Sequence, residues 1–232
     1  MAVLHSEHAR LTVNGAALDG VLVEPDDGQR HPGVVLIQEW WGIEPHVLEL
    51  AHKLAAAGFV TFVPDHYHGR VCTEPDEAGK EMMLLFENLE RAIKEIGASI
   101  EYLRSRPNVE PKKIGVIGFC MGGLLTFKAA ERFGDQVGAA VPFYGVNYTP
   151  KPEEVAQVRA PILAIFGRDD PFVPLEQVRQ IEETYRAAGK DIRVSVYPAG
   201  HAFVNPDHGN LDPDSAEKAW NEAITFLRER LR

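Results

Sequence analysis

The sequence predicts an α/β protein with a mostly parallel central sheet flanked by helices. Short apolar runs typical of buried strands alternate with longer segments whose apolar residues recur every three or four positions. Glycine or proline marks several of the boundaries, as at Gly58, Pro64 and Gly189. Repeated strand–helix–strand order requires right-handed crossovers, which place parallel strands side by side in one sheet.

The first half of the chain is predicted to hold a hairpin followed by strand–helix units. Asn14-Gly15 is a turn signal that favours a hairpin. Continuous apolar runs are typical of strands that helices cover on both faces. The repeat from Leu85 to Leu103 at steps of three and four is typical of a helix. In chain order, the expected elements are strands 10–13 and 21–24, strand 33–38, a helix over about 45–57, strand 59–64 and one long helix over about 79–105.

The second half continues the alternation. Segment 121–133 is apolar almost all round, which indicates a buried helix. Pro174 begins a helix that ends at Gly189, and the last helix is expected to be capped by Asp212 and to begin at Pro213. In chain order, the expected elements are strand 113–118, helix 121–133, strand 137–145, strand 161–167, helix 174–188, strand 192–198 and a closing helix that reaches Leu231.

Composition and charge argue against several classes of protein. The 232 residues include 34 acidic and 24 basic side chains, a net charge of −10, which disfavours nucleic acid or an anionic membrane as partner. No apolar run has the ~18 to 20 residues that span a bilayer, and the opening segment lacks a signal-peptide pattern. Two cysteines, Cys72 and Cys120, are too few for a disulfide scaffold. We expect a single domain over 1–232, cytoplasmic and monomeric, with a homodimer as the alternative and a small molecule as its partner.

The residues that follow each strand are the candidates for chemistry, because parallel α/β sheets bind ligands beyond the carboxyl ends of their strands. The sequence GFCMGG (118–123) has the pattern of a nucleophile elbow with Cys120 in the central place. So tight a strand-to-helix turn requires small residues two positions away, here Gly118 and Gly122. The helix N-terminus is expected to favour a thiolate, and the Met121 N–H to point at an oxyanion.

Two further strand ends supply an acid and a base. Asp170 follows strand 161–167 and His201 follows strand 192–198, so the chain order is nucleophile, acid, histidine, as in α/β hydrolases. Histidine, with an unperturbed pKa of ~6.5, can take and return a proton near neutrality. The carboxylate orients the ring, and the thiol forms an acyl intermediate. The N–H of Trp40, after strand 33–38, is the candidate second oxyanion donor.

The chain resembles the dienelactone hydrolase family (carboxymethylenebutenolidases) of the α/β-hydrolase fold. The residues that carry the resemblance are QEWWG (38–42), PDHYHG (64–69), GFCMGG (118–123), FYG (143–145), GRDDPFVP (167–174) and AGHAF (199–203). The resemblance implies that Cys120 is the nucleophile and His201 the base, with Asp170 rather than Asp169 as the acid. It also implies that Glu39 contacts the resting thiol until substrate displaces it. The implied reaction is hydrolysis of an ester or lactone without a cofactor.

One position departs from the pattern of the family. Members that process dienelactone hold its carboxylate with two arginines, one in the segment after PDxY and one four residues past the histidine. Here Asn205 occupies the later position, and Arg70 and Lys80 in the earlier segment do not align clearly with an arginine of the family. We therefore expect an acyl substrate that is less anionic than dienelactone or different from it.

Several residues near the strand ends have a structural as well as a functional interpretation. Trp40 and Trp41 could line the pocket or pack in the core. Cys120 could be a buried structural cysteine, Asp170 a helix cap, and Glu39 a surface carboxylate. The substrate pocket is expected to include the side chains of Trp41, Tyr144, Phe172, Phe203 and Asn205.

His66, His68 and Cys72 resemble a metal site only weakly, because the spacing fixes no third and fourth ligand. We expect no metal here, and the place of the histidines after strand 59–64 favours pocket lining.

Two alternatives to a lactone-cleaving enzyme stay open. One is a general carboxylesterase for small aryl or alkyl esters. The other is a non-catalytic binding or thiol-sensing protein on the same fold, against which the presence of Asp170 and His201 argues.

Overall fold

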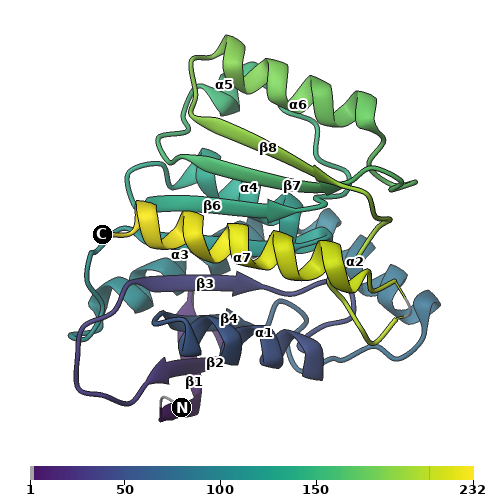
Figure 1. Ribbon diagram of the computed structural model, residues 1–232. Coiled ribbons are helices and arrows are strands. Elements are labelled where there is room, and N and C mark those ends of the chain that lie inside the picture. The colour runs from purple at the N-terminus through teal and green to yellow at the C-terminus, as the bar shows by residue number, and fades with distance from the viewer. Residues whose placement is uncertain (1–2, 209) are drawn as a thin grey trace.

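One sheet of eight strands forms the centre of the protein (Figure 1). The structure, a computed structural model, describes residues 3–208 and 210–232. The strands lie in the order β1-β2-β4-β3-β5-β6-β7-β8. Their bounds are β1 (Leu4–Val13), β2 (Ala16–Pro25), β3 (Gly33–Ile37), β4 (Val60–Pro64), β5 (Ile114–Phe119), β6 (Val137–Phe143), β7 (Ile162–Gly167) and β8 (Ile192–Tyr197).

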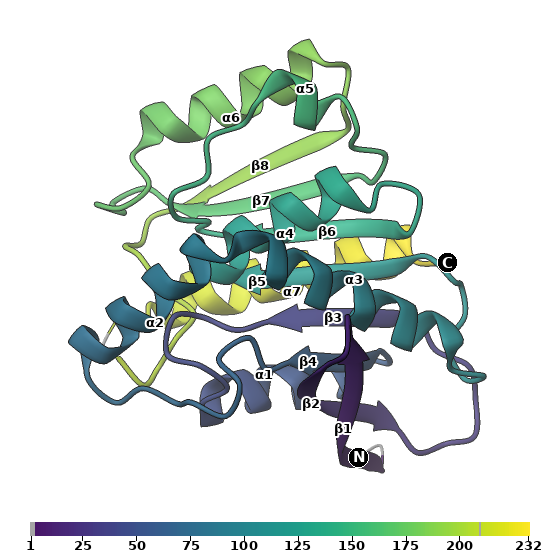
Figure 2. The ribbon, with the colours of Figure 1, turned by 180° about the vertical axis from the view of Figure 1, so that it is seen from behind.

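Helices cover both faces of this sheet. Their bounds are α1 (Pro45–Ala56), α2 (Pro75–Glu87), α3 (Leu89–Ser105), α4 (Met121–Arg132), α5 (Pro152–Val155), α6 (Leu175–Ala187) and α7 (Pro213–Arg230). Helices α1 and α7 lie on the face toward the viewer in Figure 1, and α3 and α4 lie on the opposite face, seen in Figure 2. None of the helices in the described part of the chain combines the length and the apolarity needed to cross a bilayer.

The sheet is mostly parallel, as the strand–helix alternation predicts. Strands from β4 to β8 in the sheet order pair in parallel, and the two antiparallel pairings are β1 with β2 and β2 with β4. The hairpin predicted at Asn14-Gly15 is confirmed, with Val13 opposite Ala16, but its strands are longer than expected. Most side chains of β1 are exposed to solvent, so the strand has no continuous apolar run to reveal its length.

The single long helix expected over 79–105 is wrong, because the chain forms two helices that meet at Asn88. The Asn88 side-chain amide donates to the Leu84 carbonyl oxygen at 2.9 Å, and its backbone leaves the helical region with φ −117° and ψ 34°. An asparagine side chain that competes for backbone acceptors commonly ends a helix. The apolar repeat hides the break, since Leu85 and Leu89 keep a spacing of four across it. The short helix α5 has no counterpart in the sequence prediction.

The turn between β5 and α4 is the most crowded point of the fold. Every residue of β5 is buried, and Cys120 has the left-handed φ of +54°. A Cβ atom on Gly118 would stand 2.3 Å from the carbonyl oxygen of Gly122, and one on Gly122 would stand 2.5 Å from that of Gln38. Real Cβ atoms do not approach so closely, so only glycine fits at both positions. The turn therefore holds Cys120 at the carboxyl edge of the sheet, as the sequence predicts for an elbow.

Candidate active site

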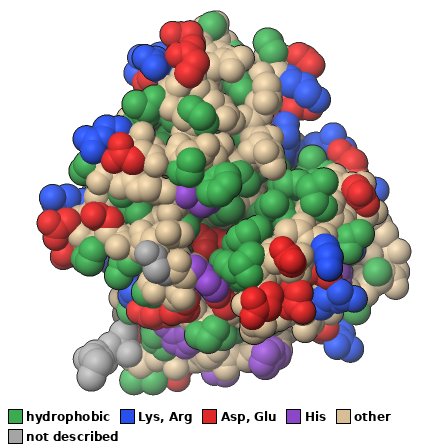
Figure 3. All heavy atoms as spheres, turned by 90° about the vertical axis from the view of Figure 1, so that its right-hand side faces the viewer, with side chains coloured by type: hydrophobic (Ala, Val, Ile, Leu, Met, Phe, Trp, Pro, Cys, Tyr) green, Lys and Arg blue, Asp and Glu red, His purple; other side chains and the backbone are tan. Residues whose placement is uncertain are grey.

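The carboxyl ends of β3, β5, β7 and β8 open on one end of the molecule, shown in Figure 3. On this face, histidine and apolar side chains surround a hollow in which acidic atoms are visible. The chain segments that follow these four strands supply the candidate residues Glu39, Cys120, Asp170 and His201. The sheet topology therefore gathers side chains that are far apart in the sequence.

Cys120 presents a buried thiol at the N-terminus of α4. The residue is 7 % exposed, and its backbone N–H donates to the Phe143 carbonyl oxygen at 3.1 Å. Burial raises the pKa of the thiol well above its usual value, and the nearby Glu39 carboxylate adds to this rise. A hydrogen bond from the Met121 N–H lowers the pKa but does not offset the burial. Burial and the Glu39 charge therefore oppose the thiolate that the helix N-terminus is expected to favour.

His201 and Asp170 are joined by a short hydrogen bond. The His201 Nδ1 and Asp170 Oδ2 atoms are 2.7 Å apart. The other carboxylate oxygen accepts the backbone N–H groups of Phe172 at 2.8 Å and Val173 at 3.2 Å, so the buried carboxylate is fixed in place. Asp169 instead pairs with Arg168 in solvent. Of the two neighbouring aspartates, the structure brings only Asp170 to the histidine.

The thiol and the imidazole are not hydrogen-bonded to each other. No such bond joins the Cys120 sulfur to the His201 ring, although Glu39 lies within electrostatic reach of both. The His201 ring is held from two sides by the rings of Tyr144 and Phe172, each with its centroid 5.0 Å away. The imidazole is therefore fixed in place but is not bonded to the thiol.

Glu39 is a carboxylate in a site that solvent scarcely reaches, with 2 % of its surface exposed. The Tyr144 hydroxyl donates to its Oε1 at 3.0 Å, and the Asn205 side-chain amide donates to its Oε2 at 2.6 Å. Burial raises the pKa of Glu39, while the hydrogen bonds from Asn205 and Tyr144 act in the opposite direction. Its charge in turn disfavours the Cys120 thiolate. The residue is thus buried beside the thiol and is not a surface carboxylate.

The two candidate oxyanion donors lie at the start of α4 and in the loop after β3. The Met121 N–H belongs to the first residue of α4, directly after Cys120. The Trp40 N–H has no hydrogen-bond acceptor among the described residues, so it is free to bind a ligand oxygen. A pair of backbone N–H groups that converges near a nucleophile can stabilise a tetrahedral intermediate.

The aromatic residues expected in the pocket have different surroundings. Phe172 is 66 % exposed and lies against His201, where a substrate could reach it. Phe203 is fully buried and packs on Tyr144 with a centroid distance of 5.6 Å, so it supports the site rather than lining an open pocket. Trp41 is also buried, and its ring stacks on His208 at 3.8 Å. Trp40 is half-buried against Trp41.

Sequence reasoning missed two residues of this region, Glu44 and His208. The Glu44 Oε2 and His208 Nε2 atoms are 2.8 Å apart, and Glu44 also accepts a hydrogen bond from Asn205 at 3.0 Å. The available signal was weak: Glu44 precedes the helix-starting Pro45 shortly after a strand end, and His208 lies seven residues past His201.

His66 and His68 face helix α3 instead of lining the pocket. His66 Nδ1 lies 2.8 Å from one oxygen of the buried Glu95, and His68 Nε2 lies 3.0 Å from the other. His66 is completely buried, so the expectation of pocket lining is wrong for this residue. Cys72 is buried as well, and burial raises the pKa of its thiol. Within residues 3–208 and 210–232, no group of three or more His, Cys, Asp or Glu side chains is placed to hold a metal ion.

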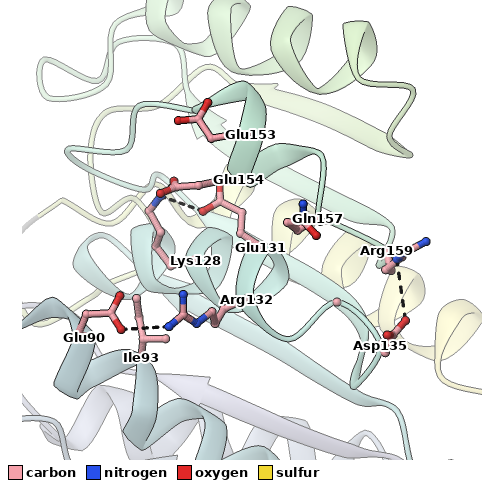
Figure 4. Close-up of a pocket in the computed structure, with 11 residues that line it drawn as sticks. Glu90, Ile93, Lys128, Glu131, Arg132, Asp135, Glu153, Glu154, Gln157 and Arg159 are labelled. Carbon is pink, nitrogen blue, oxygen red and sulfur yellow. Dashed lines mark hydrogen bonds and ion pairs between the residues drawn. The ribbon is translucent and has the colours of Figure 1, made fainter.

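A second cavity, of about 350 Å³, lies among α3, α4 and α5 (Figure 4). Its charged side chains pair with one another, as in the contact of Lys128 with Glu131 at 2.8 Å and that of Arg132 with Glu90 at 3.3 Å. The residues that line it include no cysteine, serine, threonine or histidine. Of these two places, only the carboxyl end of the sheet brings a cysteine and a histidine to the same region.

Comparison with known proteins gives a consistent result. The model of the dienelactone hydrolase family matches residues 18–231. Protein usf of Aquifex pyrophilus is 37 % identical over 224 residues, which cover 94 % of this chain and 96 % of the relative. The carboxymethylenebutenolidase of a Pseudomonas species is 31 % identical over 207 residues, covering 86 % and 85 %. Among solved structures, a dienelactone hydrolase-like promiscuous phosphotriesterase from metagenomic libraries has a TM-score of 0.91 at 22 % identity, with full coverage of both chains, which shows the same fold.

Replacing Glu39 by glutamine is expected to make the Cys120 thiol more reactive. Burial is the main reason for the raised pKa of this thiol, and the Glu39 charge is the second. The Glu39→Gln change removes the second cause, so the pKa falls and the thiolate fraction at neutral pH rises. Alkylation of Cys120 by iodoacetamide, followed against pH, should therefore be several-fold faster. The exposed Glu49 on α1 gives a matched control, Glu49→Gln, which should alkylate at the wild-type rate. Unchanged or slower alkylation in Glu39→Gln would contradict the prediction.

Proposed function

The chain belongs to the dienelactone hydrolase family, and we propose that it hydrolyses esters or lactones through a triad of Cys120, His201 and Asp170. The observation that carries most weight is the 2.7 Å bond from His201 Nδ1 to the buried Asp170 carboxylate, at the sheet edge where the elbow presents Cys120. A carboxylate in that position fixes the ring tautomer so that Nε2 can accept a proton, and it stabilises the imidazolium that forms.

The reaction begins with activation of the thiol. Substrate entering the hollow displaces the Glu39 carboxylate from beside Cys120, and the sulfur turns toward His201. The S–H proton then passes to His201 Nε2, which leaves a thiolate and an imidazolium that Asp170 stabilises. In the resting state, burial and the Glu39 charge both oppose this step, so the thiol stays protonated until a substrate is present.

Acyl transfer follows in two steps. The thiolate sulfur forms a bond to the substrate carbonyl carbon, and the carbonyl oxygen becomes an oxyanion held by the N–H groups of Trp40 and Met121. The oxyanion collapses, the C–O bond of the alcohol breaks, and His201 gives its proton to that oxygen. Water then loses a proton to His201 as it attacks the acyl-cysteine, and the freed sulfur takes this proton back as the acid departs. In a lactone, the alcohol and the acid stay in one molecule.

The substrate class follows from the charges around the site. Glu39 and Glu44 are both buried there, and Asn205, which contacts both, is neutral. A substrate that carries its own carboxylate would meet two like charges without a fixed arginine to hold it. We therefore propose that neutral acyl groups, in aryl or alkyl esters or in uncharged lactones, are the preferred substrates.

The role of Asp170 is tested by a change that keeps its shape. Asp170→Asn should lower kcat for p-nitrophenyl ester hydrolysis by roughly 10²- to 10⁴-fold, because the amide cannot stabilise the imidazolium and favours the wrong ring tautomer. The neighbouring Asp169→Asn provides the control and should keep wild-type kcat, since Asp169 pairs only with Arg168 in solvent. Equal losses in the two variants would contradict the triad. If the wild-type protein hydrolyses no member of a broad ester and lactone panel, the thiol-sensing alternative gains support.

The substrate class is tested by comparing kcat/KM on dienelactone with kcat/KM on neutral aryl esters and uncharged lactones of similar size. We expect the neutral substrates to be preferred by about tenfold or more, the factor that corresponds to roughly 1.4 kcal/mol of unfavourable interaction. A strong preference for dienelactone would show that the site binds a substrate carboxylate after all. Equal use of esters and lactones would favour a general carboxylesterase.

A further inference from the structure

The side chain of Asn205 joins two buried carboxylates. The residue is 1 % exposed, and its Nδ2 donates to Glu39 Oε2 at 2.6 Å and to Glu44 Oε1 at 3.0 Å. Its Oδ1 accepts the backbone N–H of Asp207 at 2.9 Å. This last bond fixes which side of the amide faces the carboxylates, because a backbone N–H requires the oxygen. Both polar atoms of the Asn205 side chain, Nδ2 and Oδ1, are therefore hydrogen-bonded.

Glu44 is itself held from its other side. Its Oε2 lies 2.8 Å from His208 Nε2, and the His208 ring stacks on Trp41 at 3.8 Å with an interplanar angle of 9°. Glu44 and Trp41 belong to the loop after β3, while Asn205 and His208 belong to the segment after β8. The contacts thus tie the loop that contains Glu39 to the segment after β8, and they leave the Asn205 amide little freedom to move.

A neutral donor has a particular effect between two carboxylates. The Asn205 amide donates a hydrogen bond to Glu39, but unlike an arginine it brings no positive charge to neutralise the carboxylate. A hydrogen bond to the ionised form also favours that form, so the Asn205 bond helps Glu39 to keep its negative charge in a buried place. That charge acts on the thiol. The titratable groups that face Glu39 are Cys120, Tyr144, His201 and Glu44.

We propose that Asn205, anchored by Glu44, is a positioning residue that holds the Glu39 carboxyl group beside Cys120 and so keeps the thiol unreactive until substrate arrives. This inference rests on the proposed role of Cys120 as nucleophile. Neither residue touches the reacting atoms; Asn205 acts through Glu39, and Glu44 acts through Asn205. Substrate that enters the hollow has to separate Glu39 from this anchor, which couples binding to activation.

The experiment measures the alkylation rate of Cys120 by iodoacetamide at neutral pH, with peptide mass spectrometry to follow this cysteine separately from Cys72. Asn205→Ala should be alkylated roughly three- to tenfold faster than wild type, the range that loss of one hydrogen bond commonly produces. Glu49→Ala on the exposed face of α1 is the control and should react at the wild-type rate.

The decisive comparison repeats Asn205→Ala in a Glu39→Gln background. There the charge that Asn205 positions is absent, so the second change should leave the rate of Glu39→Gln unaltered. An equal acceleration in both backgrounds would show that Asn205 only blocks access to the sulfur, and it would overturn the proposal. An unaltered rate in Asn205→Ala alone would overturn it too. The assay reads the sulfur and not ester turnover, so full hydrolysis by Cys120→Ala would refute the proposed function independently of these rates.

Discussion

The constraint on which the rest of the structure depends is the close approach of backbone at the turn between β5 and α4. Gly118 and Gly122 pass so near to carbonyl oxygens that neither has space for a Cβ atom. This contact forces the intervening Cys120 into a left-handed conformation and holds its sulfur at the N-terminus of a buried helix. The cost of an unusual φ for a cysteine, of order 1–3 kcal/mol, is carried by the surrounding packing. The backbone geometry of Cys120, the candidate nucleophile, is thus fixed by the turn itself and does not depend on Asp170 or His201.

Electrostatics then decides the state of that sulfur. A helix N-terminus favours a thiolate, but the burial of Cys120 and the nearby charge of Glu39 outweigh it. Glu39 is in turn held by Tyr144 and Asn205. In the proposed mechanism, the backbone of the site is already arranged for reaction, and substrate binding activates the thiol by displacing Glu39.

The sequence was sufficient to predict the fold class and the strand ends at which Asp170 and His201 lie, because apolar runs and glycine or proline boundaries are local signals. The position of the Asn88 break was hidden, since the apolar spacing continues across it and only the side-chain bond to Leu84 reveals the end of the helix. The resting protonation of Cys120 could not be predicted either. It depends on burial and on contacts such as that of Asn205 with Glu39, which are 166 positions apart in sequence.

The most direct test of the central claim is to locate the acyl group during turnover. Wild-type protein mixed with a p-nitrophenyl ester, quenched in acid within a turnover and digested, should carry the acyl mass on the peptide that contains Cys120. The peptide that contains Cys72, whose thiol is buried in a loop, should be unmodified. Rapid hydrolysis with no acyl group on Cys120, or with the acyl group on another residue, would contradict the account.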